Sequence, residues 1–362
     1  MNQTYIIAEA GVNHNGSVET AKQLVNIAAE AGADAVKFQT FRAHSLVTLD
    51  APKAAYQRED SSESQYEMLK KLELNEEAHT ILLKHCRQKN IQFLSTPFDL
   101  ESVDLLTRLG VSQIKISSAD ITNAPLLLKC AKTNKPIILS TGMSLLADIE
   151  TALGVLAFGY LNPSMLPSLQ NFRTTYVSEK GQNLLKEKVA LLHCVSAYPS
   201  AVSDANLKTM DTLRMTFGLQ VGFSDHSLGI CLPIAAVARG ATLIEKHFTL
   251  DKTLPGPDHR SSLEPLELKE MVRSIRQVEQ AFGSTLKIPT PAELKNAPFS
   301  RKSLMASRAI RKGEAFSETN ITVKRPEGGL SPLYYWECLG KLADCDYQEN
   351  ELIEISFSTS FS

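Results

Sequence analysis

Short apolar runs recur along this chain, and each run ends in polar or ionisable residues before a helix-like stretch follows. Strands that alternate with helices in this way form a parallel sheet. Eight such strands close into a (β/α)8 barrel, which carries its active site at the C-terminal ends of the strands. The pattern therefore predicts an enzyme with a TIM-barrel domain. The competing architecture, an open doubly wound sheet, does not need polar residues at the end of every strand. The eight runs end at Glu9, Lys37, Ser95, Ser117, Ser140, His193, Ser224 and Glu245.

Two of the predicted connections are long. Residues Arg42 to Asn75 separate the second strand from its helix and are polar, with Tyr56 and Gln57 among them. A connection of this length without structure of its own is typical of a lid or a binding loop. The second connection, from about Phe158 to Lys188, precedes the sixth strand. We interpret it as a surface insertion without a catalytic role.

The composition changes after a helix that ends near Phe282. We predict a barrel domain over residues 1–283 and a proline-rich linker over residues 284–298. A small, strand-prone domain follows over residues 299–358 and contains the turn Arg311–Glu314. A domain of about sixty residues is near the lower limit for a self-supporting core, so we expect it to dock on another surface.

Bulk properties exclude several classes of protein. The chain has 362 residues, 43% hydrophobic and 22% charged, and a net charge of −2, so it offers no basic stripe for nucleic acid. No apolar run approaches the ~20 residues of a membrane span, and no signal peptide precedes the first strand. Six scattered cysteines without CxxC spacing are typical of buried thiols in a cytosolic protein. We therefore expect a cytoplasmic protein without nucleic-acid or membrane partners.

Three lysines, Lys37, Lys115 and Lys246, lie at or next to strand ends. A lysine in a buried strand is unfavourable unless it meets an anion. Lysines that converge with serines make a site for phosphate or carboxylate. Two alternatives remain at this point: each lysine pairs with a barrel carboxylate, or one of them forms a Schiff base as in class I aldolases.

His226 and His247 end the seventh and eighth strands, which are neighbours in a barrel. Their imidazoles can approach one divalent ion and leave positions open for water and substrate. His193 and His14 are weaker candidates for the pocket. Cys194 lies beside a candidate site residue, but the sequence places no base for it.

At these motifs the chain resembles the sialic acid synthase (N-acetylneuraminate synthase) family. The C-terminal segments resemble the family's antifreeze-protein-like SAF domain, so the resemblance covers nearly the whole chain in order. The segments that carry it are Ile7–Gly16, Ala35–Thr40, Ala51–Lys53, Tyr56–Gln57, Ser95–Asp99, Leu139–Met143, Gly222–His226, Glu245–Asp251, Gly256–His259, Arg301–Ser303 and Val323–Pro326.

The resemblance implies an enzyme that condenses phosphoenolpyruvate with an open-chain N-acetylated mannosamine-type sugar and releases phosphate, using Mn2+ or Mg2+ and no Schiff base. It also implies a domain-swapped homodimer in which Arg325 of one subunit enters the partner's active site. It assigns Glu9, Lys37, Lys115 and Arg325 to catalysis and His226 and His247 to the metal. The phosphoenolpyruvate site would include Lys37, Thr96, Lys115, Ser118, Ser140 and Ser224, with Ser196 near the phosphate, and the sugar site Glu9, Gln39, Asp120, Tyr198 and Asp258.

Two positions depart from some members of that family. Asp120 is shorter than the glutamate of many bacterial members, and Ser196 replaces an amide or a threonine. The expected product is a nine-carbon sialic acid made from N-acetylmannosamine. The alternative is legionaminic or pseudaminic acid, made from a 2,4-diacetamido-2,4,6-trideoxyhexose. More remote alternatives are a Schiff-base aldolase and a non-catalytic sugar-binding protein.

Overall fold

The computed structural model describes residues 3–53, 63–162 and 164–355, so Tyr56 and Gln57 lie outside the described residues. The chain forms two compact units, Met1–Phe282 and Gly283–Ser362. Each unit is described by itself.

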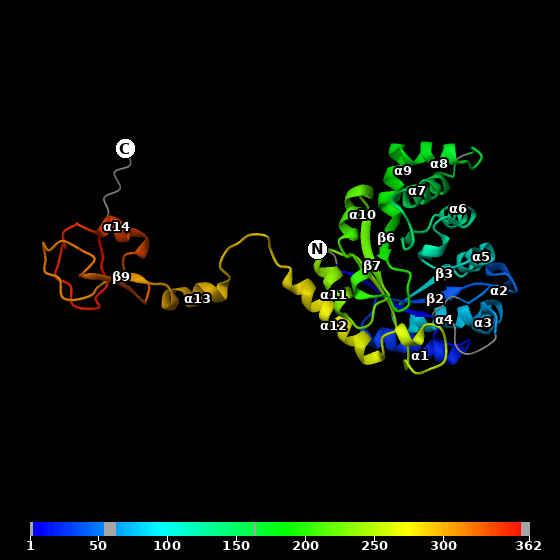
Figure 1. Ribbon diagram of the computed structural model, residues 1–362, viewed down its shortest axis with the longest axis horizontal. Helices are drawn as coiled ribbons and strands as arrows, with labels where there is room; N and C mark the ends of the chain where they lie inside the picture. Colours follow the sequence, from blue (N-terminus) through cyan, green and yellow to red (C-terminus); the bar gives the residue numbers. More distant parts are fainter. Residues whose placement is uncertain (1–2, 54–62, 163, 356–362) are drawn as a thin grey trace. The chain divides into compact units, whose positions relative to one another are not determined.

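The first unit is an eight-stranded parallel barrel, as the sequence predicts (Figure 1). Parallel ladders join the strands in the order β3-β2-β1-β8-β7-β6-β5-β4. The two end strands, β3 and β4, lie beside each other and complete the ring. The strands are β1 (Tyr5–Gly11), β2 (Ala35–Thr40), β3 (Gln92–Pro97), β4 (Ile114–Ile116), β5 (Ile137–Ser140), β6 (Val189–Cys194), β7 (Gln220–Asp225) and β8 (Leu243–His247).

Helices follow the strands and pack their apolar faces on the outside of the barrel (Figure 1). In α1, Ser17 caps the first turn, and Gly32 ends the helix in the left-handed conformation that glycine adopts without steric cost. The main helices are α1 (Val18–Ala31), α4 (Glu76–Gln88), α5 (Leu100–Arg108), α6 (Ala124–Lys132), α7 (Leu146–Leu161), α10 (Thr209–Phe217), α11 (Cys231–Ala238) and α12 (Pro265–Ala281).

Side chains that point into the barrel form two layers. Along a strand, successive side chains alternate between the helix-facing and the inward-facing side. The lower layer is apolar and fills the base of the barrel. The upper layer, two residues further along each strand, is polar and begins the active-site floor. The apolar layer consists of Ile7, Ala35, Leu94, Ile138, Leu192 and Leu243.

The connection between β2 and α4 contains two helices, α2 (Ala43–Leu46) and α3 (Gln65–Leu72), so the expectation of a structureless loop is wrong. Helix α3 forms because Ser64 and Glu67 cap its N-terminus reciprocally, and its apolar residues fall on one buried face. These residues pack with Val12 and Phe41 in a small core of their own.

The segment from Phe158 to Lys188 is also helical. It holds the end of α7, then α8 (Leu169–Tyr176) and α9 (Glu179–Lys188). Phe158 packs edge-on against Phe172, with ring centroids 5.2 Å apart, and so anchors α8 on α7. Within its described part, no residue of this insertion lines the active-site cavity.

The second unit contains α13 (Pro291–Ser300), the antiparallel strands β9 (Ser303–Ala306) and β10 (Ile321–Lys324), and α14 (Tyr335–Cys338). Its core includes Leu304, Phe316 and Tyr347. Much of the expected linker is therefore helix α13. Pro291 is at the first turn, where a proline starts a helix instead of breaking it, and Thr290 and Glu293 form the cap. Across the described residues, no helix is long and apolar enough to cross a membrane.

Candidate active site

A cavity of about 640 Å³ opens at the C-terminal ends of the barrel strands. This volume suits two small substrates. Every barrel residue that the family resemblance assigns to the site lines this cavity. They are Glu9, Lys37, Gln39, Thr96, Lys115, Ser118, Asp120, Ser140, Ser196, Tyr198, Ser224, His226, His247 and Asp258.

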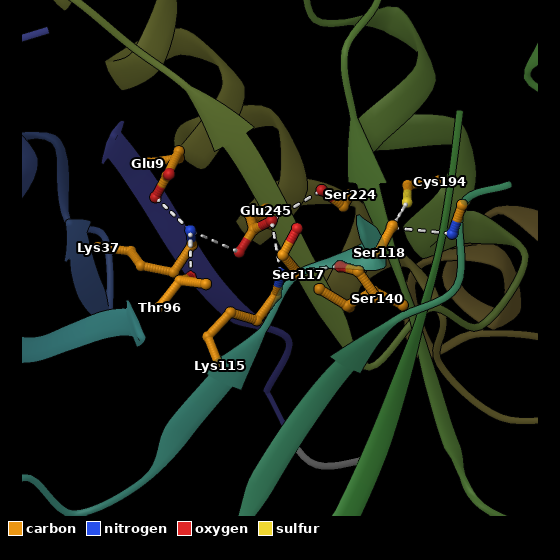
Figure 2. A network of polar contacts seen from close by, with 12 residues as sticks. Glu9, Lys37, Thr96, Lys115, Ser117, Ser118, Ser140, Cys194, Ser224 and Glu245 are labelled. Atoms are coloured by element: carbon orange, nitrogen blue, oxygen red, sulfur yellow. Dashed lines mark hydrogen bonds and ion pairs between the residues drawn. The ribbon is translucent and has the colours of Figure 1, made fainter. Parts of the chain in front are cut away.

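Four buried charges form the centre of the cavity floor (Figure 2). Lys37 Nζ lies 2.7 Å from Glu9 Oε2 and 3.7 Å from Glu245 Oε2. Lys115 Nζ lies 3.3 Å from the other carboxylate oxygen of Glu245. Glu245 therefore lies between the two lysines, and two positive charges balance two negative ones.

Hydroxyl groups complete the coordination of these charges (Figure 2). Lys37 donates to Thr96 Oγ1 at 3.2 Å, and Lys115 donates to Ser140 Oγ at 2.8 Å. Ser224 donates to Glu245 Oε1 at 2.8 Å. Lys37 is thus fixed by two carboxylates and one hydroxyl, and Lys115 by one carboxylate and one hydroxyl, which directs both ammonium groups at a common region of the floor.

Burial and the neighbouring charges shift the pKa values of this group in different directions. Burial raises the pKa of Glu9 to about 7, although Lys37 opposes this shift. Burial alone would also raise the pKa of Glu245, but Lys115 and Lys37 outweigh it and hold that pKa at about 2. Burial lowers the pKa of Lys115, against the attraction of Glu245. Glu9 is therefore the carboxyl group of this cluster that changes charge near neutral pH.

Beside Lys115, small side chains surround the backbone of Gly142. Gly142 N donates to Ser118 Oγ at 2.9 Å, and Ser118 Oγ lies 3.1 Å from Cys194 Sγ. A Cβ atom at Gly142 would lie only 2.4 Å from Ser196 Oγ. The close approach of backbone N–H and hydroxyl groups next to a lysine is the arrangement that binds phosphate oxygens. Burial raises the pKa of Cys194, so the thiol stays protonated there.

Carboxyl and amide groups gather further out in the cavity. Gln39 lies two residues beyond Lys37 on β2 and donates to Glu9 at 3.4 Å. Asp120, in the 3-10 helix η2 (Ser118–Asp120), has Oδ2 buried with no protein hydrogen-bond partner in the described structure. Burial raises the pKa of Asp258 to about 6. These groups can accept hydrogen bonds from the hydroxyl and amide groups of a sugar.

His226 and His247 converge at the ends of β7 and β8, with ring centroids 5.6 Å apart. Nδ1 of His226 lies 2.6 Å from the carbonyl of Val195, which leaves Nε2 to face a ligand. Nδ1 of His247 is buried and has no hydrogen-bond partner among the described residues, and Asp258 Oδ2 is 3.7 Å away. Burial lowers the pKa of both imidazoles and keeps them neutral. Neutral, outward-oriented imidazoles fit a divalent ion.

No cluster of three or more histidine, cysteine or acidic residues fit for a metal occurs among the residues described. His226 and His247, the pair that the sequence indicates, are the candidate ligands, and the rest of the coordination shell would come from water and substrate.

Two residues at strand ends face away from the cavity. Lys246 follows Glu245 on β8, so it points to the opposite side, where it pairs with Asp225 at 2.5 Å and donates to the carbonyl of Ser227. The expectation that Lys246 joins an anion site is wrong, and the alternative of a carboxylate partner holds. His193 likewise faces the helices, with Nε2 2.8 Å from the carbonyl of Ala205.

The sequence-based site omits Glu245, although this carboxylate contacts both lysines and Ser224. The sequence did contain a signal for Glu245. It directly follows the apolar pair Leu243–Ile244, just as Lys37 directly follows Ala35–Val36. The interpretation of the Arg42–Asn75 connection as a binding segment agrees with the cavity, because α2 and α3 line it, although the connection is helical. Arg325 lies in the second unit, directly after β10, and is exposed.

A sequence profile of the NeuB family matches residues 24–287, and a profile of the SAF domain matches residues 301–356. The chain belongs to the NeuB family. The resemblance to sialic acid synthases and the TIM-barrel-plus-SAF fold are thereby confirmed.

Individual members of the family are similar over almost the entire chain. The N,N'-diacetyllegionaminic acid synthase of Campylobacter jejuni is 50% identical over 98% of this chain and 99% of its own length. The synthase of the same name from Legionella pneumophila is 46% identical over 91% of this chain and 87% of its own. The crystal structure of an N-acetylneuraminic acid (sialic acid) synthetase from Leptospira borgpetersenii, in complex with citrate, is 34% identical. It covers 82% of this chain and 90% of that one, with a TM-score of 0.66.

Proposed function

We propose that this NeuB-family protein condenses phosphoenolpyruvate with a 2,4-diacetamido-2,4,6-trideoxyhexose and water, giving a legionaminic-type nine-carbon acid and phosphate. The names of relatives that are 50% and 46% identical support this sugar. They favour the alternative of the sequence analysis over its main expectation, which was N-acetylmannosamine.

The observation that carries the proposal is the pair of buried ammonium groups on the cavity floor. Phosphoenolpyruvate has a carboxylate and a phosphate separated by one carbon, so it needs two cationic positions close together. Lys37 and Lys115 supply them on either side of Glu245. Ser118, Ser140 and the N–H groups near Gly142 add donors on the Lys115 side. We assign the phosphate to that side of the floor.

The reaction follows from where the charges lie. C3 of phosphoenolpyruvate attacks the aldehyde carbon of the open-chain sugar, and positive charge develops at C2. The carboxylate of Glu9 stabilises this charge electrostatically. Water then adds at C2, and Glu9, with its pKa raised to about 7, accepts the proton. The alkoxide left on the former aldehyde oxygen takes up the proton that Glu9 received. The C2–O bond to phosphate then breaks as the new C2 hydroxyl loses its proton and becomes a keto group. Phosphate carries that proton away, and the lysines balance its remaining charge.

A divalent ion, Mn2+ or Mg2+, would be held by His226 and His247 and would supply Lewis-acid polarisation of the aldehyde oxygen. Tyr198 stacks on His226 with ring centroids 4.2 Å apart, and Asp258 approaches His247. These contacts hold the two imidazoles in place at the mouth of the cavity.

We further propose that the active protein is a homodimer and that Arg325 of one subunit binds the sugar in the partner's barrel. The family resemblance supports this assignment, and the planar guanidinium suits bidentate recognition of an amide oxygen or a hydroxyl. All six cysteines are free thiols, which fits the reducing conditions of the cytoplasm.

One observation favours a second mechanism. Burial lowers the pKa of Lys115, and a desolvated lysine can form a Schiff base with a keto acid. That mechanism predicts that borohydride with pyruvate traps a covalent adduct on Lys115 and that chelators have no effect. The ion pair of Lys115 with Glu245 opposes this lowering and favours the ammonium form, which supports the anion-binding role instead.

Phosphate release and product mass test the proposal directly. The purified protein is assayed with phosphoenolpyruvate and, separately, N-acetylmannosamine and the manno- and altro-configured 2,4-diacetamido-2,4,6-trideoxyhexoses. We expect the highest kcat/KM with the manno-configured diacetamido sugar and a product that retains the sugar plus pyruvate. Equal or better turnover of N-acetylmannosamine would contradict the assigned sugar, and no phosphate release with any of the three would contradict the condensation.

A further inference from the structure

One side of the active-site cavity is apolar, in contrast to its charged floor. Five side chains make up this apolar wall: Leu46, Val47, Met68, Leu69 and Leu72. Leu46 ends α2, Val47 follows it, and the other three come from α3. The whole wall thus derives from the connection between β2 and α4, and none of its residues belongs to the barrel strands.

The wall is held rigidly although it lies outside the barrel. Met68, Leu69 and Leu72 fall on one face of α3 and are each less than 10% exposed. They pack against Val12 after β1 and Phe41 after β2. The capping box of Ser64 and Glu67 fixes the start of α3. The wall is therefore a preformed surface of the cavity.

The polar partners for a sugar lie on other sides of the same cavity. Gln39, Asp120 and Asp258 present amide and carboxyl groups, and Asp120 Oδ2 has no protein hydrogen-bond partner in the described structure. A sugar that fills the cavity then meets mostly hydrogen-bonding groups on one side and mostly C–H groups on the other. Gln65, at the start of α3, is the polar exception among the described lining residues of the two inserted helices. A hydroxyl placed against the apolar wall would lose its water without gaining a partner.

N-acetylmannosamine and a 2,4-diacetamido-2,4,6-trideoxyhexose differ in what they can present to such a wall. The first has hydroxyl groups at C4 and C6. The second has a methyl group at C6 and an acetamido group at C4, whose methyl end is apolar and whose N–H can still donate to a carboxylate. Its two methyl groups are the parts that an apolar surface receives favourably.

We propose that the apolar wall of α2 and α3 is the specificity-determining element of this site, and that it selects a sugar with C–H groups at C6 and at the end of its C4 substituent. This inference rests on the proposed function and adds the residues that select the sugar. The inserted helices α2 and α3 determine which sugar binds, whereas the residues of the barrel floor bind phosphoenolpyruvate.

The experiment measures kcat/KM for the manno-configured diacetamido sugar and for N-acetylmannosamine, at saturating phosphoenolpyruvate, in the full-length protein. Met68→Gln keeps the side-chain length and the helix preference but adds an amide. Val47→Thr adds a hydroxyl with little change in shape at a half-buried position, so it carries little risk for folding. We expect the ratio of the two kcat/KM values to fall by about 10- to 100-fold in Met68→Gln, and by a smaller factor in Val47→Thr.

Two controls separate recognition from general damage. Met68→Leu keeps the wall apolar and should keep the ratio of wild type. Lys70→Gln changes an exposed residue of the same helix that does not line the cavity, and should leave both kcat/KM values unchanged. The KM for phosphoenolpyruvate should stay within about twofold of wild type in every variant, because the wall does not contact the floor lysines.

An unchanged ratio in both Met68→Gln and Val47→Thr, with a wild type that prefers the diacetamido sugar, would overturn the role of the wall and leave the proposed function intact. A wild type that prefers N-acetylmannosamine would overturn the proposed sugar and this inference together. The inference would be supported if the ratio falls because kcat/KM for the diacetamido sugar decreases while the KM for phosphoenolpyruvate is unchanged.

Discussion

Lys115 and Lys246 show how the position of a residue along its strand decides its role. Both are buried lysines flanked by barrel residues, and both contact a carboxylate. Lys115 points into the barrel and meets the cavity, whereas Lys246 points to the helices and pairs with Asp225. The alternation of side chains along a strand accounts for the difference.

Replacing each lysine by alanine should therefore have opposite consequences. Lys115→Ala should lower kcat/KM for phosphoenolpyruvate on the order of 10- to 100-fold or more with the fold retained, because it removes a charge-assisted contact with the substrate. Lys246→Ala should leave Asp225 buried and unpaired, and so reduce the free energy of unfolding by about 3–5 kcal/mol. Steady-state kinetics and denaturant unfolding of both variants check this pair. Unchanged kinetics in Lys115→Ala would reduce that lysine to a structural ion-pair partner.

The raised pKa of Glu9 predicts a pH dependence. The mechanism needs the carboxylate form, so kcat/KM should rise as pH increases through about 7, the value to which burial raises the pKa of this residue. In Glu9→Gln, activity should be low and should lack this rise, keeping only the ionisations of the substrates. A pH–rate profile of wild type and variant from pH 5.5 to 8.5 measures the difference. If kcat/KM rises with pH in the same way in both proteins, the rise must come from the ionisation of another group.

Glu9 also links pH to stability. Its pKa in the folded state is above that of an exposed glutamate, so the folded state binds the proton more tightly than the unfolded state does. Its contribution to stability is complete below the unfolded pKa and is lost as pH rises through the folded pKa of about 7. The functional carboxylate is therefore kept at a cost in stability near neutral pH.

Much of the site was predictable residue by residue, and the exceptions have physical causes. Because side chains alternate along a strand, the sequence predicts that Lys37, Lys115 and Ser140 face into the barrel. The same rule, applied to the eighth strand, predicts that Glu245 faces inward and Lys246 faces the helices. Asp258 follows no such rule because it lies outside the strands, and only the resemblance indicated it. The pKa shift of Glu9 depends on burial and on two lysines from other strands, which no local pattern encodes.

At the scale of elements, the ends of adjacent strands bring together groups far apart in the chain. His226 and His247 are neighbours because β7 and β8 pair in parallel. Two imidazoles leave most of the shell of a divalent ion to water and substrate, so the ion should exchange readily.

Chelation should therefore abolish turnover, and Mn2+ should restore it. The variant with both His226→Ala and His247→Ala should regain no turnover when Mn2+ is added. Calorimetry should also show that it no longer binds Mn2+. Full activity after exhaustive chelation, or Mn2+ binding that survives in the double variant, would contradict the metal assignment.

The strands were easier to predict from sequence than the inserted helices. Each strand shows a short apolar run and a polar end, whereas α2 has four residues and α3 eight. Helices this short gain their stability from packing on the barrel more than from their own sequence. The tertiary contacts of α3 with Val12 and Phe41 therefore decide a structure that the polar composition of the segment conceals.

For the whole molecule, the division after Phe282 gives a direct test of what the second unit contributes. Truncation after Phe282 should leave a folded barrel, seen by circular dichroism, that no longer turns over sugar. In the full chain, Arg325→Ala should mainly raise the KM for the sugar and leave the KM for phosphoenolpyruvate nearly unchanged. A truncated barrel with full activity would remove Arg325 from the reaction.

Mixing subunits tests whether the tail serves a partner. His247→Ala and Arg325→Ala subunits should each be inactive or weak on their own. If Arg325 acts across subunits, heterodimers contain one intact site, and activity should partly recover after subunit exchange. If activity does not recover in mixtures that are shown to have exchanged subunits, each C-terminal domain acts on the barrel of its own subunit.

The apolar layer fills the barrel beneath the site, within the described residues. Ile7, Leu94 and Leu192, with the other members of that layer, fill the barrel directly beneath the lysines. Gln39, two residues beyond Lys37 on β2, and Asp120 and Asp258, beyond the strand ends, lie nearer the mouth, whereas Glu9 belongs to the floor. On the proposed function, phosphoenolpyruvate would bind before the sugar, which would then cover it. After the reaction, phosphate would stay at the bottom of the cavity until the nine-carbon product departs.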